Sequence, residues 1–412
     1  MLRTVRAWAA AAAGLAAAAA LAAFLCGVAS VQDDTAYYTR GELANIFAHA
    51  APQSPPPDPT DRVADDPRAA RFGQYLFFDT AFSANGKVSC ATCHQPARGF
   101  TDGLALAHGI GTGTRHTPTV LGDANNHWYF WDGRTDTQWS QALQPFENKL
   151  EIGTNRVRVV RAVAADPALR AAYVQIFGPL PASVSHDGFA VDRAFSNLGK
   201  AIEAYERRLT VGTSPFDRYL AALRAHDAQG EQVISPAAKR GLALFTGAGN
   251  CELCHSGPMF SDEQFHNIGL PVLAGEKPDP GRLEGIALVR ADPFNATGRF
   301  SDDPRYPPKA MQLAFLPPPA SELGAFKTPT LRNVAIAGPY MHDGRFTTLA
   351  QVLDFYARGK AASTGRLEGT REETTNLIPA LTPAQQADLE AFLETLTDRP
   401  LPAQLTRQPA TP

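Results

Sequence analysis

Apolar residues recur at helical spacing along much of this chain, and no stretch alternates long enough to predict a useful strand. The segment from Asp192 to Leu209 has the clearest stripe. Its apolar positions share one helical face, at Phe195, Leu198, Ile202 and Tyr205. Since 33 glycines and 33 prolines interrupt the pattern elsewhere, we expect modest helices joined by long irregular loops, hence a mainly α protein.

Capping residues mark the starts of three further helices. The Ser235-Pro236 pair is a cap with proline at the first helical position, and this helix should end at Gly247. Residues 348–351 (Thr-Leu-Ala-Gln) fit a capping box that opens a helix to about Tyr356. Residues 382–385 open another helix, with three residues predicted to face inward: Leu389, Phe392 and Leu393.

The N-terminus has the order of a secretory signal, because Arg3 and Arg6 precede an Ala-rich apolar run that extends to about residue 28. The small residues Ala29 and Ser30 suit cleavage, whereas the length of the run favours an uncleaved membrane anchor as the alternative. We interpret Cys26 as part of the apolar run. Residues 1–30 are therefore predicted to direct the chain to the periplasm as a signal peptide or an N-terminal anchor.

Length and charge narrow the classes of protein. A chain of 412 residues suits two domains of ordinary size, and a net charge of −3 gives no reason to expect nucleic acid as a partner. A Pro-rich linker is predicted over 31–62, because residues 51–60 cannot hold a regular helix. We then expect a first domain over 63–225, a second over 226–400 and a tail over 401–412.

The candidate chemistry lies in two copies of Cys-x-x-Cys-His. Such thiols can form thioethers with the two vinyl groups of a haem, and the adjacent histidine can ligate its iron. The copies consist of Cys90, Cys93 and His94, and of Cys251, Cys254 and His255. A lone cysteine pair also fits a zinc half-site or a redox pair, but here each pair has its own histidine. The histidines lie 161 residues apart (255 − 94), so the motifs predict two covalent haems c, one in each half of a duplicated chain.

Further segments occur in an order that resembles the bacterial dihaem cytochrome c peroxidase family, and within it the MauG-like branch. The likeness spans about residues 65–395 and includes both haem motifs. It also rests on Leu-Phe-Phe-Asp at 76–79, Phe-Trp-Asp-Gly-Arg at 130–134, Phe-Lys-Thr-Pro-Thr-Leu-Arg-Asn at 326–333 and Gly-Pro-Tyr-Met-His-Asp-Gly at 338–344. The resemblance implies two cytochrome c-like haem domains packed against each other.

The resemblance also implies that hydrogen peroxide reacts at the first haem. Family residues that handle peroxide fall on Gln141, Pro145 and Glu151 of this sequence. Glu151 would serve as the acid–base group for cleavage of the O–O bond, Gln141 would orient peroxide, and Pro145 would shape the distal wall. His108 falls where some dihaem peroxidases carry a removable sixth iron ligand, a position that MauG-like enzymes usually leave open.

At the second haem the resemblance implies Tyr356 as the sixth iron ligand. It lies fourteen residues after His342, where MauG-like enzymes have tyrosine and other dihaem peroxidases have methionine. Met341 is the rival candidate. A phenolate is a hard, anionic ligand, so a tyrosine there would stabilise the oxidised forms of iron.

Two further features are implied between the domains. Trp131 matches the tryptophan that lies between the haems of the family and can relay charge. Family members also bind calcium there through two backbone carbonyls, at the positions of Ala337 and Pro339, and through an asparagine side chain. The asparagine position is His116 in this chain, and imidazole is a poor ligand for calcium.

Together these features predict a periplasmic dihaem peroxidase that reduces hydrogen peroxide with electrons from a small cytochrome c or a cupredoxin. One alternative is a MauG-like oxidase that modifies a partner protein. Gly249 disfavours the known version of that activity, because the resemblance places a surface tryptophan at this position. The other alternative is a dihaem cytochrome that only transfers electrons.

Overall fold

The computed structural model describes residues 34–186, 188–359, 366–369 and 377–412. The predicted export segment, including Cys26, lies outside the described residues. The chain is mainly helical, which confirms the predicted fold class. The helices are α2 (Arg40–Ala48), α3 (Pro67–Phe78), α4 (Cys90–Cys93), α5 (Gln138–Glu147), α6 (Arg156–Ala165), α7 (Pro167–Phe177), α8 (Phe189–Glu206), α9 (Pro215–Ala225), α10 (Pro236–Phe245), α11 (Arg282–Ala291), α12 (Pro307–Ala314), α13 (Leu349–Arg358) and α14 (Pro383–Glu394). Two short strands, β1 (Phe265–His266) and β2 (Phe326–Lys327), pair antiparallel.

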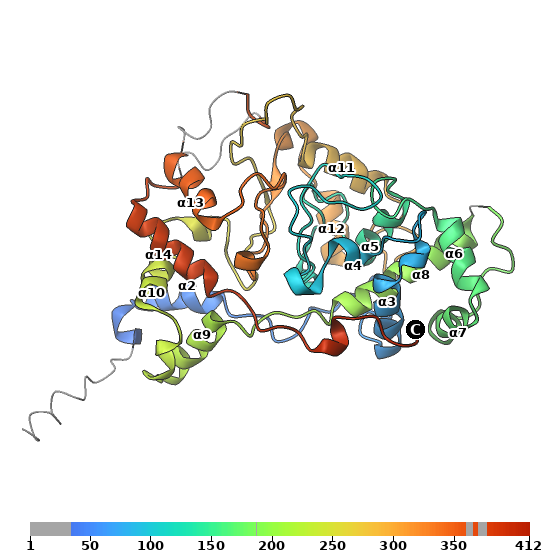
Figure 1. Cartoon of the computed structure of the whole chain (residues 1–412), viewed down its shortest axis with the longest axis horizontal. Helices are drawn as coiled ribbons and strands as arrows, with labels where there is room; N and C mark the ends of the chain where they lie inside the picture. The colour runs from blue at the N-terminus through green and yellow to red at the C-terminus, as the bar shows by residue number, and fades with distance from the viewer. Residues whose placement is uncertain (1–33, 187, 360–365, 370–376) are drawn as a thin grey trace, which may run out of the picture.

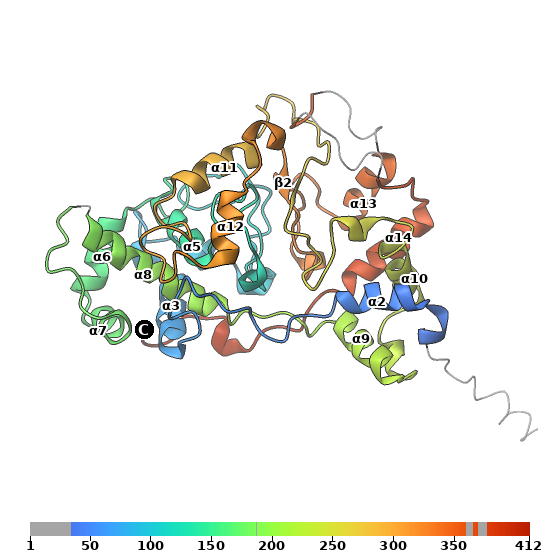
Figure 2. The same cartoon turned by 180° about the vertical axis from the view of Figure 1, so that it is seen from behind.

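The helices gather in two lobes, seen from opposite sides in Figures 1 and 2. Helices α3 to α8 form the first lobe, which contains the first haem motif. Helices α2, α9, α10, α13 and α14 form the second lobe around the second motif. Each lobe has its own large hydrophobic core.

A pair of crossing helices stabilises each lobe in the same way. Helix α3 packs on α8, and α10 packs on α14. A glycine lies at each crossing: a Cβ added at Gly73 would lie 1.7 Å from the carbonyl oxygen of Ala201, and one at Gly241 would lie 1.9 Å from that of Asp388. Only a residue without a side chain allows such a close approach of two backbones. The crossings therefore fix where each chain segment enters its haem motif.

The predicted helices are present with the predicted caps. The long stripe forms α8, and Ser235 caps α10 by accepting a hydrogen bond from the backbone N–H of Ala238. Capping boxes open α13 at Thr348 and α14 at Thr382. The three residues predicted to face inward from α14 are all buried. These starts were predictable because capping depends on residues only three positions apart.

Each end of the chain packs on the lobe that is farther from it in the sequence. Ile46 of α2 and Phe216 of α9 pack in the second core, although the predicted limits place them in the linker and the first domain. Conversely, the tail packs on the first lobe, where Gln74 Nε2 donates to the carbonyls of Gln404 (2.6 Å) and Arg407 (2.8 Å). The segment after α11 packs there too, through Phe294 and Phe300.

Among the described residues, none of the helices has both the length and the hydropathy that a membrane span requires.

The glycine crossings yield a stability prediction. Replacing Gly241 by Ala forces a methyl group into the backbone of α14, so the free energy of unfolding should fall by about 1–3 kcal/mol or more. Gly41→Ala is the matched control, since its added Cβ has no neighbour closer than 3.9 Å within helix α2. Chemical denaturation of both variants tests this. Equal stability of the two would show that the crossing tolerates a side chain.

Candidate functional site

A large cavity lies where the two lobes meet and opens to solvent; its space, counted together with the solvent at its mouth, is about 2130 Å³. It is continuous from the first haem motif to the second, because His94 and His255 both line it. Trp131, Gln141 and Tyr356 line it as well. The structure thus brings these five predicted site residues together around one space, and four more line it: Cys251, Cys254, Ala337 and Pro339.

Each motif histidine is oriented by a backbone carbonyl. Nδ1 of His94 lies 3.1 Å from the carbonyl oxygen of Phe100, and Nδ1 of His255 lies 2.9 Å from that of Phe260. Both phenylalanines have left-handed backbones, with φ of 60° and 51°, which turn these carbonyls toward the rings. A histidine that donates through Nδ1 presents Nε2 as its metal ligand.

The electrostatics of the two motifs also suit iron ligation. Burial lowers the pKa of His94 and of His255, which favours the neutral imidazole that a metal needs. The cysteines of each motif form no disulfide and are partly exposed, so they are accessible to a haem edge. The residues present therefore fit a covalently bound haem at each motif.

The site contains a sequence and structural repeat. Residues 117–147 match residues 328–358 at a constant difference of 211, the difference between Tyr129 and Tyr340. The bridge between Tyr129 and Thr135 recurs between Tyr340 and Phe346. Left-handed residues recur at 130 and 341, and helix caps at 137 and 348. Helices α5 and α13 are therefore equivalent elements, one at each motif.

The repeat pairs residues of different chemistry at equivalent positions. Tyr356 of α13 matches Pro145 of α5, since 356 − 211 is 145. Likewise His342 matches Trp131. A phenol can ligate iron, whereas a proline side chain cannot. The same scaffold therefore carries a tyrosine in the second half and a proline in the first at equivalent positions.

Tyr356 lies close to the second motif. Burial raises its pKa, and the Cys254 and Cys251 thiols contribute in the same direction. It shares the cavity wall with His255. Met341, the rival candidate, also lines the cavity but has a left-handed backbone in the turn before α13.

Glu151 is held beside α5 by a turn of the backbone. The N–H of Ile152 donates to the carbonyl of Pro145 at 3.0 Å, which folds the chain back on the helix. The Glu151 carboxylate accepts a hydrogen bond from Asn148 Nδ2 at 2.6 Å. Burial raises its pKa, and Arg134 and Asn148 oppose that shift. Glu151 and Pro145 adjoin the wall formed by Gln141 but do not themselves line the cavity as the structure describes it.

His108 lies on an exposed loop near the first motif. Its backbone carbonyl is 3.7 Å from Cys93 Sγ, but its ring is turned away, with Nδ1 3.1 Å from Thr112 Oγ1. The loop is tied to the Glu151 segment, because Ile110 N–H donates to the Glu151 carbonyl at 2.9 Å. The His108 side chain does not line the described cavity.

Trp131 is fixed by contacts from both lobes. Its indole Nε1 donates to the carbonyl of His116 at 2.9 Å, and its own carbonyl accepts from Lys327 N–H at 2.8 Å. Calcium does not fit the neighbouring site implied by the resemblance. Nε2 of His116 lies 3.2 Å from the carbonyl oxygen of Ala337, so a ring nitrogen faces a carbonyl that calcium would need as a ligand.

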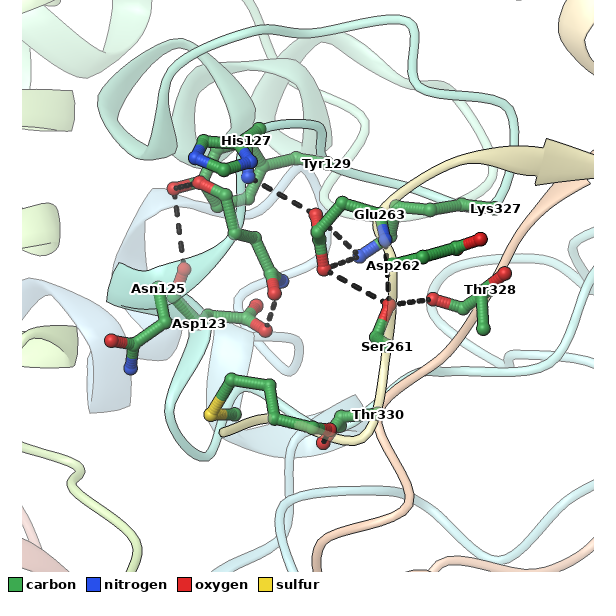
Figure 3. Close-up of polar contacts among 12 residues, drawn as sticks. Asp123, Asn125, His127, Tyr129, Ser261, Asp262, Glu263, Lys327, Thr328 and Thr330 are labelled. Atoms are coloured by element: carbon green, nitrogen blue, oxygen red, sulfur yellow. Dashed lines mark hydrogen bonds and ion pairs between the residues drawn. The ribbon is translucent and has the colours of Figure 1, made fainter. Parts of the chain in front are cut away.

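A further polar network, not predicted from the sequence, joins the lobes beside the cavity (Figure 3). Glu263 accepts a hydrogen bond from the backbone N–H of His127 at 3.0 Å and pairs with Lys327 Nζ at 3.4 Å. Ser261 donates to the carbonyl of Thr328 at 2.7 Å. Lys327 also lines the cavity with Asp123, so two ionisable groups lie at its wall. A comparison of the two sequence repeats would have pointed to only one residue of this network. That residue is Lys327, which takes the position equivalent to His116.

Gly249 allows no large side chain with this backbone. A Cβ added there would lie 2.6 Å from the carbonyl oxygen of Leu244. A large side chain at this position would therefore need a different local backbone.

Two haem-attachment motifs in cytochrome c-like lobes define a dihaem c-type protein, and comparisons with known proteins agree. A family model described as di-haem cytochrome c peroxidase matches residues 67–225. The methylamine utilization protein MauG of Methylorubrum extorquens is 34% identical over 347 residues, covering 83% of this chain and 82% of that protein. Cytochrome-c peroxidase IdrP1 of Denitromonas iodatirespirans is 31% identical over 357 residues, covering 85% and 87%.

Solved structures agree with these relatives. The dihaem peroxidase BthA of Burkholderia thailandensis superposes with a TM-score of 0.64 at 27% identity, over 88% of this chain and 95% of that one. A MauG-like protein associated with microbial copper homeostasis superposes with a TM-score of 0.64 at 26% identity, over 87% of this chain and 98% of that one. The chain belongs to the MauG-like dihaem cytochrome c peroxidase family. It is an oxidoreductase of the peroxidase type that carries two haem c groups.

Buried carboxyls near the cavity predict how stability changes with pH. Burial raises the pKa of Asp123 to about 7 and that of Glu206 to about 8. In the unfolded chain such groups ionise at about pH 4. Between that pH and their raised pKa values, the folded state therefore binds more protons than the unfolded state. The free energy of unfolding should therefore fall as pH rises from about 4 to about 8.

Asp123→Asn and Glu206→Gln should each make that decline shallower, because each removes one of the two groups. Chemical denaturation across the pH range measures the slope. Glu284→Gln, an exposed carboxyl on α11, is the control and should leave the slope unchanged. A variant slope equal to that of the wild type would mean that these carboxyls are ionised in the folded protein.

Proposed function

We propose that the protein reduces hydrogen peroxide to water at the first haem, held by Cys90, Cys93 and His94. The electrons come from a small periplasmic donor, a cytochrome c or a cupredoxin, by way of the second haem. Each turnover consumes two electrons and two protons per peroxide and yields two waters. The periplasmic location rests on the N-terminal export pattern.

The pairing of Pro145 with Tyr356 carries this assignment. The two residues take equivalent places on α5 and α13, so the two haems receive different distal neighbours from one scaffold. An inert proline would leave a coordination position available for peroxide at the first haem, whereas Tyr356 would supply a ligand at the second. The first motif is therefore the place for substrate, and the second is the place for electron transfer.

The chain's own residues would manage the protons. When bound, the first haem supplies the iron that accepts peroxide and the electrons that cleave its O–O bond. Glu151 takes a proton from one peroxide oxygen and returns it to the other. Its burial supports this role, because a raised carboxyl pKa is closer to the pH at which a shuttle exchanges protons readily. Gln141, on the cavity wall, orients the peroxide.

Tyr356 would act through its phenolate. Burial raises its pKa and so disfavours the phenolate in the absence of a positive charge. A bound ferric iron would provide that charge, so ligation and deprotonation would accompany each other. The anionic ligand then favours the oxidised iron at the second site. Trp131, which lines the same cavity as His94 and His255, is the relay between the sites.

His108 is proposed to leave the first haem open at rest. Its ring is exposed and contacts Thr112 rather than the cavity, which supports an open site. The ferric protein should then react with peroxide without prior reduction.

A second candidate function is the oxidation of a partner protein. The name of the Methylorubrum extorquens relative and the tyrosine at position 356 favour this function. Gly249 removes one exit route for that chemistry, so the partner would need to dock elsewhere. A crosslinked or hydroxylated residue in a periplasmic partner, formed only with peroxide, would favour this function over peroxide reduction.

Replacing Glu151 by Gln should lower kcat for peroxide reduction by on the order of 10²–10⁴-fold, because the amide cannot move the proton. The rate of the wild type should rise with pH as the carboxyl ionises, and this limb should disappear in the variant. Stopped-flow kinetics and steady-state turnover measure both. Glu276→Gln, an exposed residue, is the matched control. Full activity of the Glu151 variant would exclude the proposed shuttle.

Replacing Tyr356 by Phe should convert the second haem from six-coordinate to five-coordinate, since the phenyl ring has no oxygen to ligate iron. Resonance Raman and electron paramagnetic resonance of the ferric protein report the change in spin state. The wild type should also show a near-infrared band from charge shared between the haems after one equivalent of peroxide, and the variant should lack it. Tyr340→Phe, on the same cavity wall, is the control. An unchanged spin state would make Met341 the ligand to test next.

A further inference from the structure

His116 lies at a junction between the lobes and makes four polar contacts. Its ring faces two carbonyls, with Nδ1 2.8 Å from Leu104 O and Nε2 3.2 Å from Ala337 O. Its backbone N–H donates to the carbonyl of His342 at 2.7 Å, and its own carbonyl accepts the Trp131 indole at 2.9 Å. The residue is only 5% exposed.

We propose that the imidazole of His116 takes the place of the calcium ion that the family binds here. This chain then joins its lobes, and positions Trp131, without calcium. His116 acts as a positioning residue, since it contacts Trp131 and not the substrate. The readouts below do not depend on peroxide turnover, so this proposal and the proposed function can fail separately.

The donor set supports the replacement. Calcium prefers six to eight oxygen ligands from carboxylates, carbonyls and waters. Here one of the implied ligands, the Ala337 carbonyl, faces a ring nitrogen, and the asparagine oxygen is missing. The Nε2 atom thus faces a carbonyl oxygen that calcium would need as a ligand.

The charges around His116 also disfavour a bound calcium ion. The nearby carboxylates of Asp132 and Asp279 both pair with Arg115, at 2.5 Å and 2.8 Å. Asp102 accepts hydrogen bonds from Thr117 Oγ1 at 3.1 Å and from a backbone N–H. These acidic groups are already compensated within the protein, so they add little attraction for a divalent cation.

The contacts of His116 include Trp131, the proposed relay. The His116 carbonyl holds the Trp131 indole, while its ring holds the Ala337 segment of the second lobe. Loss of the ring would free both carbonyls and loosen the turn that carries the Trp131 contact. An oxygen ligand restored at position 116 would again allow an ion to join the same carbonyls.

The test uses the holoprotein with both haems. After treatment with EGTA and gel filtration, the wild type should contain no calcium, and its thermal midpoint and haem spectrum should not change when calcium is added. His116→Ala should lower the midpoint by several degrees, with no recovery on adding calcium. His116→Asn should bind calcium and regain the lost stability and the wild-type rate of electron transfer between the haems.

Retention of one calcium per wild-type chain, with a lower midpoint after EGTA, would overturn the proposal. So would a His116→Asn variant that folds and takes up no calcium, because the ring would then not occupy an ion position. If that variant does not fold, His116→Gln offers the same amide oxygen on a longer arm, and the wild-type measurement decides independently. His186→Asn, at an exposed histidine, is the matched control and should respond to neither EGTA nor calcium.

Discussion

The site depends on one hydrogen bond made twice, from Nδ1 of a motif histidine to the carbonyl of a phenylalanine five or six residues later. This contact fixes the ring's orientation and leaves Nε2 as the ligand atom. It requires a left-handed phenylalanine, an uncommon conformation that the surrounding core must compensate. Both Phe100 and Phe260 are fully buried, so the same side chains that enforce the turn also anchor it in the hydrophobic core.

Around that fixed geometry, the duplicated scaffold differs at a few positions. Helices α5 and α13 begin with the same kind of threonine cap and follow the same turn, yet one presents Pro145 and the other Tyr356. The backbone thus supplies two similar haem sites, and single side chains distinguish them. Function in such a fold is set by the substituted residues rather than by the architecture.

The features that the sequence predicted depend on short spacing. The haem motifs, the capping boxes and the stripe on α8 are each defined within a few residues, and all three kinds are present. Contacts between distant segments were not predictable in this way. The ring of His116 against Ala337 joins residues more than 200 positions apart, and the place of α2 in the second core depends on residues of α9 and α14. No local pattern encodes such pairings, because they depend on how the lobes dock.

The crossing of the chain ends bears on the order in which this protein can be assembled. Helix α2 is synthesised before either lobe, but its packing partners in α9, α10 and α14 follow much later. The first lobe can form its core as soon as α8 has emerged, while α2 must wait for the rest of the chain. Its exposed apolar face meanwhile needs protection from aggregation. Residues 404 and 405 then close on α3 and α8, so the first lobe gains these contacts only after the second lobe has been synthesised.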